Sequence, residues 1–141
     1  MRQVVVSRFE KHYQLLIADD DPRFREVLCA ILEPFFELIE AESGEQAIDI
    51  VEQCQIDIAL FDMHMHVLTG LETLKVVKTI NQIMPVIIIT ADVTDDLKRD
   101  ATEADAFDVL SKPVSKNELV STVSTAIVDT YDADDGWLPL N

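Results

Sequence analysis

The sequence is poor in positive charge, and this deficit excludes several classes of partner. Only 11 lysine and arginine residues stand against 27 aspartate and glutamate residues, so the 141-residue chain has a formal net charge of −16. A chain with this charge repels the phosphate backbone of nucleic acids and the surface of anionic membranes. We therefore expect no direct binding to nucleic acid and no association with a membrane.

Cysteine and long apolar runs are scarce as well. The two cysteines, Cys29 and Cys54, are too few and too far apart for a disulfide scaffold or a cysteine-rich zinc site, so we expect reduced structural thiols. The longest apolar runs, such as residues 86–89, are far shorter than a membrane span, and the N-terminus has no signal-peptide h-region. We expect the protein to be cytoplasmic.

The chain length allows one compact domain with a single core. The apolar share of 48% is ordinary for a globular protein. We predict a folded domain over residues 12–130, an N-terminal tail over residues 1–11 and an acidic C-terminal tail over residues 131–141.

Apolar runs of strand length alternate five times with segments of helical period. This alternation is typical of βαβ units, whose parallel strands form a sheet covered by helices on both faces. We therefore predict an α/β fold with a single five-stranded parallel sheet in the flavodoxin-like strand order 2-1-3-4-5. The predicted strands cover residues 14–18, 36–40, 58–61, 86–89 and 107–110.

Two helix starts have clear capping signals. Asp21 directly precedes Pro22, as expected of an N-cap residue followed by proline at the first helical position. Ser43 with Gln46 three residues later forms a capping-box pattern. We therefore assign Asp21 to helix capping and exclude it from the site described next.

Polar residues stand at the ends of the central strands. The first strand is followed by Asp19 and Asp20, the third by Asp62, the fourth by Thr90 and the fifth by Lys112. In open α/β sheets ligands bind outside the carboxyl ends of the strands, near the point where the strand order reverses, which here lies between strands 1 and 3. Hydrophobic patterning does not require these residues at one edge, so they predict a site.

The three carboxylates of this site require a positive charge. Two carboxylates about 4 Å apart repel by roughly 4 kcal/mol at an effective dielectric of 20. Lys112 offers one charge, and Mg²⁺ suits a site with few carboxylates because it keeps waters and accepts phosphate oxygens. Lys112 and the Thr90 hydroxyl can hold the remaining oxygens of a transferring phosphoryl group. These features predict that Asp62 is the nucleophile.

These residues resemble the response-regulator receiver family of CheY-like domains over about residues 13–128. The resemblance implies that a sensor histidine kinase or a phosphotransfer protein phosphorylates Asp62, which switches binding of an unidentified downstream effector; homodimer formation is left open. It also implies a signalling domain whose only chemistry is its own phosphorylation and dephosphorylation. The matching motifs are Asp19-Asp20, Asp62 with Met65 and Gly70 downstream, Thr90-Ala91 and Lys112-Pro113.

The resemblance further implies a set of metal ligands. Asp20 and Asp62 would bind Mg²⁺, Asp19 would bind it through water, and the backbone carbonyl of His64 would complete the protein ligands. His64 and His66 also offer two imidazoles for a transition metal, but two such ligands make a poor site.

The resemblance also implies that Lys112 contacts the phosphoryl group and that the peptide bond before Pro113 is cis. Three positions depart from the family pattern. His66 replaces a usual proline, which puts the rigidity of its loop in doubt, and Asp105 replaces a frequent glycine, which suggests a strained turn. Val109 replaces a frequent aromatic residue, so signal readout at this position is expected to differ.

A receiver that binds partners without phosphorylation is one alternative, against which stands the presence of every chemical residue of the site. Two other functions are further alternatives. The run of acids from Asp19 to Asp21 after an apolar strand resembles the motif of haloacid-dehalogenase-type phosphatases, in which Asp19 would be the nucleophile. The chain is short for that fold, and Asp62 and Gly70 would have no role. A flavodoxin-like module that binds FMN is disfavoured because three acids in the first turn repel a phosphate.

Overall fold

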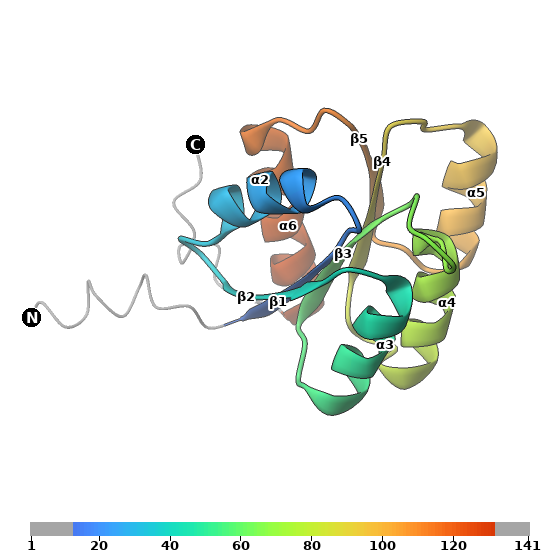
Figure 1. Cartoon of the computed structure of the whole chain (residues 1–141), viewed down its shortest axis with the longest axis horizontal. Coiled ribbons are helices and arrows are strands. Elements are labelled where there is room, and N and C mark those ends of the chain that lie inside the picture. The colour runs from blue at the N-terminus through green and yellow to red at the C-terminus, as the bar shows by residue number, and fades with distance from the viewer. Residues whose placement is uncertain (1–12, 132–141) are drawn as a thin grey trace, which may run out of the picture.

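The computed structural model describes residues 13–131, in which five strands alternate with five helices (Figure 1). The predicted tails lie, apart from Tyr131, outside the described residues, and the predicted domain boundaries stay predictions. The elements are β1 (Gln14–Ala18), α2 (Pro22–Leu32), β2 (Glu37–Ala41), α3 (Gly44–Gln53), β3 (Ile58–Asp62), α4 (Gly70–Ile80), β4 (Val86–Thr90), α5 (Asp95–Glu103), β5 (Asp108–Ser111) and α6 (Lys116–Tyr131).

All five strands are parallel and lie in the order β2-β1-β3-β4-β5, which confirms the predicted fold. Helices α2 and α6 cover one face of the sheet, and α3, α4 and α5 cover the other (Figure 1). Every residue of β3 and β4 is buried, because both strands have neighbours on each side and helices above and below.

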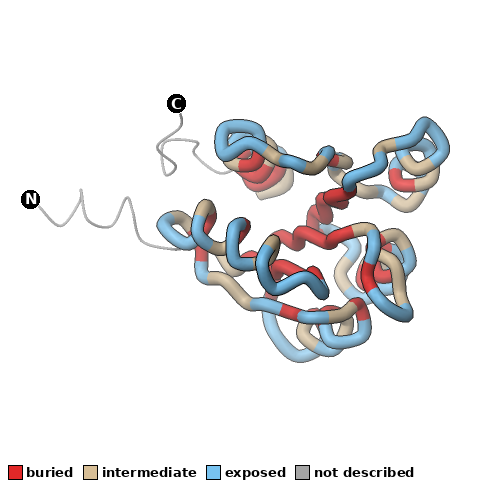
Figure 2. Tube along the Cα trace, turned by 45° about the horizontal axis from the view of Figure 1, so that its top comes forward, coloured by how far each residue is buried: buried red, intermediate tan, exposed pale blue. Residues whose placement is uncertain are grey.

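Alternate side chains of each strand enter two separate cores. Leu15 and Ile17 pack with α2 and α6, whereas Leu16 and Ala18 pack with α3 and α4. Buried segments accordingly run through the middle of the molecule and exposed segments lie on the outer turns (Figure 2). Because burial of one large apolar side chain contributes about 1.5–3 kcal/mol, these cores hold the strand ends rigidly in register.

The second strand begins one residue later than predicted. Phe36 donates its amide to the carbonyl of Leu32 (3.1 Å), so it still belongs to the turn that follows α2. The β1–β2 pairing starts at Glu37, whose amide donates to Tyr13 (3.1 Å), and ends at Ala41. The other four strands match their predicted ranges within one residue.

Both helix caps form, although one differs from the predicted pattern. The Asp21 side chain accepts a hydrogen bond from the amide of Arg23 (3.0 Å), and Pro22 begins α2. The Ser43 hydroxyl accepts from the amide of Gln46 (3.1 Å), as predicted. The Gln46 side chain, however, accepts from the amide of Glu42 (2.6 Å) and not from that of Ser43, so the reciprocal half of the capping box is wrong.

The turn before β5 has the strained backbone that the sequence suggested. Asp105 has a φ of 69°, in the left-handed region that favours glycine. Its carboxylate lies 3.4 Å from the Nζ atom of Lys78, whose ammonium also donates to the carbonyl of Met84 (2.8 Å). These contacts fix the strained turn against the end of α4.

The C-terminal end of α6 is attached to the amino end of the sheet. The Tyr131 hydroxyl donates a hydrogen bond to the carbonyl of Asp57 (2.6 Å), and its ring stacks on Tyr13 with 5.7 Å between centroids. Burial, with a smaller contribution from the Asp57 carboxylate, raises the pKa of Tyr131 to about 12. This attachment lies at the end of β3 opposite Asp62.

The structure also bears on the predictions about the two cysteines and about membrane-spanning segments. Among the described residues, Cys29 and Cys54 form no disulfide. Burial and the neighbouring Glu40 carboxylate raise the pKa of the Cys29 thiol to about 11, which keeps it protonated and unreactive. None of the described helices combines the length and the apolar character needed to cross a membrane.

Candidate functional site

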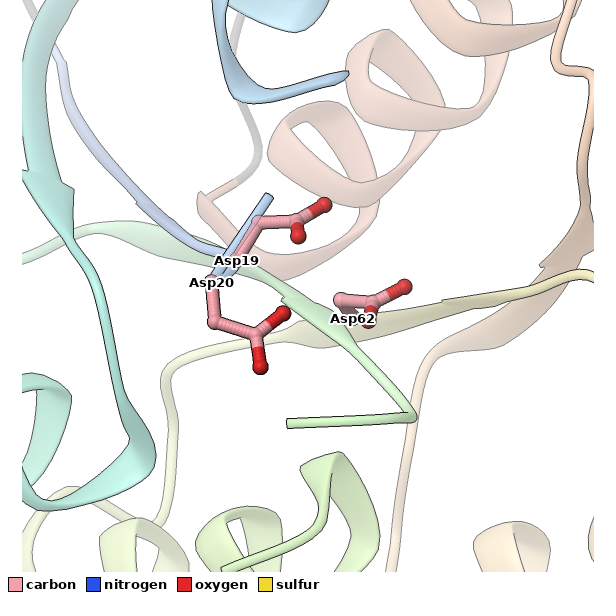
Figure 3. A group of neighbouring side chains, drawn as sticks. All are labelled: Asp19, Asp20 and Asp62. Atoms are coloured by element: carbon pink, nitrogen blue, oxygen red, sulfur yellow. The ribbon is translucent and has the colours of Figure 1, made fainter. Parts of the chain in front are cut away.

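The three predicted aspartates meet at one edge of the sheet (Figure 3). Asp19 and Asp20 follow β1, and Asp62 is the last residue of the adjacent strand β3. One carboxylate oxygen from each residue lies within 4.8 Å of the other two. The register of β1 on β3 therefore produces the acidic cluster that the strand ends predict.

Asp19 is the most buried member of the cluster, with 1% of its surface exposed. Its Oδ1 accepts a hydrogen bond from the amide of Asp21 (2.9 Å), whereas its Oδ2 accepts none. Burial raises the pKa of Asp19 to about 6; the Asp21 amide opposes this rise and the Asp62 carboxylate adds to it. The negative charge of Asp19 is thus costly unless a cation lies close to it.

Lys112 brings one positive charge to the cluster. Its Nζ atom lies 2.8 Å from Oδ1 of Asp62 and 4.0 Å from Oδ2 of Asp19. The Lys112 amide donates to the carbonyl of Thr90 (2.8 Å), so the backbone before the side chain is fixed to β4. The peptide bond between Lys112 and Pro113 is cis, as the resemblance implied.

The loop after β3 donates a hydrogen bond to Asp20, the exposed member of the cluster. Oδ2 of Asp20 accepts a hydrogen bond from the amide of His66 (3.2 Å). His64 lies in the same loop and is exposed, and its role as a carbonyl ligand stays a prediction. Val67 has a φ of 73°, which is unusual for a β-branched residue and locates the strain of this loop one residue beyond His66.

Thr90 ends β4 with its side chain fully buried. Its hydroxyl oxygen accepts a hydrogen bond from the amide of Asp92 (3.1 Å), which couples the side chain to the loop that leads into α5. Because the oxygen serves as acceptor in that bond, the hydroxyl proton is available to another acceptor. Val109, on the neighbouring strand β5, is only partly buried.

Two residues of α2 contact the site, and the sequence reasoning gave neither a role in it. Arg25 donates from Nη1 to the backbone carbonyl of Asp19 (2.6 Å) and from Nε to Glu40 (2.8 Å). Phe24 places the centre of its ring 4.1 Å from Nζ of Lys112. One signal could have indicated Arg25, since an arginine near a helix N-terminus opposes the helix dipole and calls for a specific partner.

The acidic cluster suits a divalent cation. Oδ2 of Asp19 and Oδ1 of Asp62 are buried and accept no hydrogen bond, and Lys112 approaches them only as an ion pair. Three carboxylates against one ammonium leave an excess of negative charge, and two of the three, Asp19 and Asp62, are buried. Hard cations such as Mg²⁺ prefer carboxylate oxygens, so the residues present fit this ion.

The sequence of this chain is similar to that of known signalling domains. The family model for the response regulator receiver domain matches residues 15–124. The transcriptional regulatory protein ZraR of Klebsiella oxytoca is 35% identical over 117 residues, which are 82% of this chain and 26% of that protein. The chain thus spans about a quarter of the length of such relatives.

Solved structures agree with the family match. A response regulator receiver domain protein from Clostridium thermocellum is 30% identical with a TM-score of 0.79, and the similarity covers 84% of this chain and 97% of that one. The CheX-CheY-BeF3-Mg+2 complex from Borrelia burgdorferi contains a chain that is 25% identical with a TM-score of 0.78; the similarity covers 82% of this chain and 90% of that one.

Proposed function

This chain belongs to the family of response regulator receiver domains, the receiving domains of two-component signalling systems, and we propose that Asp62 is its phosphoacceptor. The position of the Asp62 carboxylate carries this proposal. It is 6% exposed at the end of β3, with Oδ1 2.8 Å from the Lys112 ammonium. Asp19 and Asp20 stand beside it as a cation site.

The phosphatase alternative, with Asp19 as nucleophile, is not supported. The matching family is that of receiver domains over residues 15–124. Asp19 is also restrained at two points, because its Oδ1 accepts from the Asp21 amide and its carbonyl accepts from Arg25. These contacts suit a carboxylate that holds a cation more than one that attacks a substrate.

In the proposed reaction, an oxygen of Asp62 attacks the phosphorus atom of a phosphohistidine on a sensor histidine kinase or a phosphotransfer protein. The P–N bond breaks, the imidazole keeps its electron pair, and the new P–O bond forms an acyl phosphate. In dephosphorylation, a separate reaction, water attacks the phosphorus atom, the bond to Asp62 breaks with its electron pair left on the carboxylate, and inorganic phosphate leaves. These two reactions are the only chemistry that we assign to the domain.

Two side chains of the chain would bind the phosphoryl oxygens. The Lys112 ammonium, now 2.8 Å from Asp62, would move a short distance to one of them. The Thr90 hydroxyl, whose oxygen accepts from Asp92, would donate its proton to another. When bound, Mg²⁺ would neutralise charge on the transferring group, held by Asp20 and Asp62, by Asp19 through water and by the His64 carbonyl.

The proposed partners follow from the family and from the charge of the chain. We propose that phosphorylation changes the affinity of this domain for an unidentified downstream effector, and that a second copy of the chain is one candidate. ZraR is a transcriptional regulatory protein, but its similarity to this chain covers 26% of its length. The net charge of −16 supports the absence of direct nucleic-acid contact, and we propose a cytoplasmic location.

Intact mass spectrometry tests the phosphoacceptor. Incubation with acetyl phosphate and Mg²⁺ should add one phosphoryl group to the wild type and none to Asp62→Asn. Asp49→Asn is a matched control, because Asp49 is an acidic residue on α3 outside the cluster. Loss of the adduct in Asp19→Asn together with full labelling of Asp62→Asn would overturn the proposal and favour the phosphatase.

A further inference from the structure

Phe24 contacts the ammonium group that the proposed function assigns to the phosphoryl oxygen, and we propose that Phe24 is a positioning residue for Lys112. The Nζ atom of Lys112 lies 4.1 Å from the centre of the Phe24 ring. The same atom lies 2.8 Å from Oδ1 of Asp62 and 4.0 Å from Oδ2 of Asp19. The inference rests on the proposed function, because Phe24 acts in it only through Lys112.

The ring face attracts the ammonium and leaves the donors on its other side free to bind oxygen atoms. An aromatic ring carries partial negative charge on its face and binds a nearby cation electrostatically. The N–H donors of Lys112 that point away from the ring remain available to oxygen atoms. The ammonium can turn from Asp62 towards a phosphoryl oxygen and stay over the ring. An acidic or amide side chain at position 24 would instead accept one of these donors and compete with the phosphoryl group.

The backbone holds Phe24 in a defined place. Asp21 caps the first turn of α2, and Pro22 begins the helix, so the helix start has little freedom. The Phe24 side chain is partly buried against the core formed with α6. The next residue, Arg25, donates to the carbonyl of Asp19 (2.6 Å), which ties the same turn to the acidic cluster.

Lys112 needs such a restraint. Its backbone is fixed to β4 by a hydrogen bond to Thr90 (2.8 Å), but its side chain has four flexible methylene groups and is 24% exposed. Without the ring, the ammonium would spend more time in water and less beside Asp62. Loss of the ring face is therefore expected to slow phosphorylation by about threefold to tenfold.

A spectroscopic signature tests the contact in the unphosphorylated wild type. Protons next to the nitrogen of Lys112 should resonate upfield of those of other lysines, because they lie over an aromatic ring. Phe24→Leu keeps an apolar side chain and should abolish this upfield shift, whereas Phe24→Tyr should retain the upfield shift. Ordinary lysine shifts for Lys112 in the folded wild type would overturn the inference without any variant.

Phosphorylation rates with acetyl phosphate and Mg²⁺ complete the test. Phe24→Leu should lower the rate, Phe24→Tyr should restore it, and the effect of Phe24→Leu should disappear in a Lys112→Ala background. Val27→Ala, at an exposed position on the same helix, should leave the rate unchanged. Equal losses in the Leu and Tyr variants, or a loss that persists without Lys112, would overturn the inference. A wild type that takes up no phosphoryl group would instead overturn the proposed function.

Discussion

Gly70 lies directly against the backbone of Asp62. A Cβ atom at position 70 would stand 2.5 Å from the Asp62 carbonyl oxygen and 3.0 Å from Cα of Met63. The Gly70 amide donates to the carbonyl of Met63 (2.9 Å). Glycine thus allows the first turn of α4 to touch the end of β3, and this contact sets where the proposed phosphoacceptor stands relative to that helix.

Gly70→Ala should both destabilise the domain and slow its phosphorylation. The added methyl group meets backbone atoms that cannot rotate away, so α4 or the end of β3 must shift. Overpacking of this kind costs about 1–3 kcal/mol. Urea denaturation should show a loss of that size, and acetyl phosphate should label the variant more slowly. Lys116→Ala, at the exposed first residue of α6, is the control; equal stability of the two variants would contradict the role of Gly70.

Mg²⁺ should raise the melting temperature of the domain. The cluster of Asp19, Asp20 and Asp62 relieves its repulsion by binding the ion, which it can do in the folded state only. A free Mg²⁺ concentration ten times the Kd of such a site stabilises the folded state by about 1.4 kcal/mol. Asp20→Asn should weaken this dependence on Mg²⁺. Asp21→Asn should leave it intact, because asparagine is also a good N-cap. If thermal denaturation shows the same loss in both variants, the assignment of Asp21 to capping alone is wrong.

Thr90→Ala should accept a phosphoryl group on Asp62 but should transmit the resulting conformational change poorly. The Thr90 hydroxyl is coupled to the amide of Asp92 (3.1 Å), so its movement should carry the loop from residue 91 to residue 94 with it. Val109 is short and stiff at χ1, and it cannot act as a rotating aromatic side chain. Addition of beryllofluoride should therefore shift NMR signals most at residues 90–95, and much less in the variant. Changes confined to Val109 and α6 that survive in Thr90→Ala would refute this account.

Asp19→Asn should remove a pH-dependent loss of stability that is present without divalent cations. Burial raises the pKa of Asp19 from 3.8 to about 6, so the folded state holds the proton more tightly than the unfolded state does. The contribution to the free energy of unfolding is fully present below pH 3.8 and is lost as the pH rises to about 6. A rise of this size corresponds to roughly 3 kcal/mol at most.

Denaturation in EDTA measures this effect as the difference between variant and wild type. The free energy of unfolding of Asp19→Asn minus that of the wild type should be larger at pH 7 than at pH 4. The asparagine oxygen can still accept from the amide of Asp21, so the local hydrogen bond gives no compensating loss. A difference that stays constant over this pH range would show that Asp19 titrates normally.

The sequence predicts the acidic cluster because strand ends are recognisable in it. An apolar run followed at once by Asp19 and Asp20, or ended by Asp62, fixes which side chains leave the sheet at its carboxyl edge. Only the parallel pairing of adjacent strands is then needed to bring them together. The strained turn at Asp105 is predictable for a related reason, since a family preference for glycine reports the backbone angle of that position.

The particular contacts between helices and the site are beyond such reasoning, even where, as for Arg25 near a helix N-terminus, the sequence signals that a partner is needed. The Phe24 ring meets Lys112, and Arg25 meets Asp19, only because α2 packs at one particular rotation and both side chains take particular rotamers. Periodicity identifies the apolar stripe of a helix but not which of its residues reach past the sheet edge. The backbone strain at Val67 is equally hidden, because nothing about valine marks a positive φ.

The hydrogen bond between Tyr131 and Asp57 fixes the C-terminal end of α6 to the sheet. The helix has 16 residues and is therefore about 24 Å long. A displacement of about 1 Å at its first residue, Lys116, would turn it by only about 2° around Tyr131. The amplitude of this swing is greatest in the first turns of α6 and falls to nothing at Tyr131. A partner that senses the angle of this helix therefore gains most by contacting the exposed side chains of its first turn, such as Lys116.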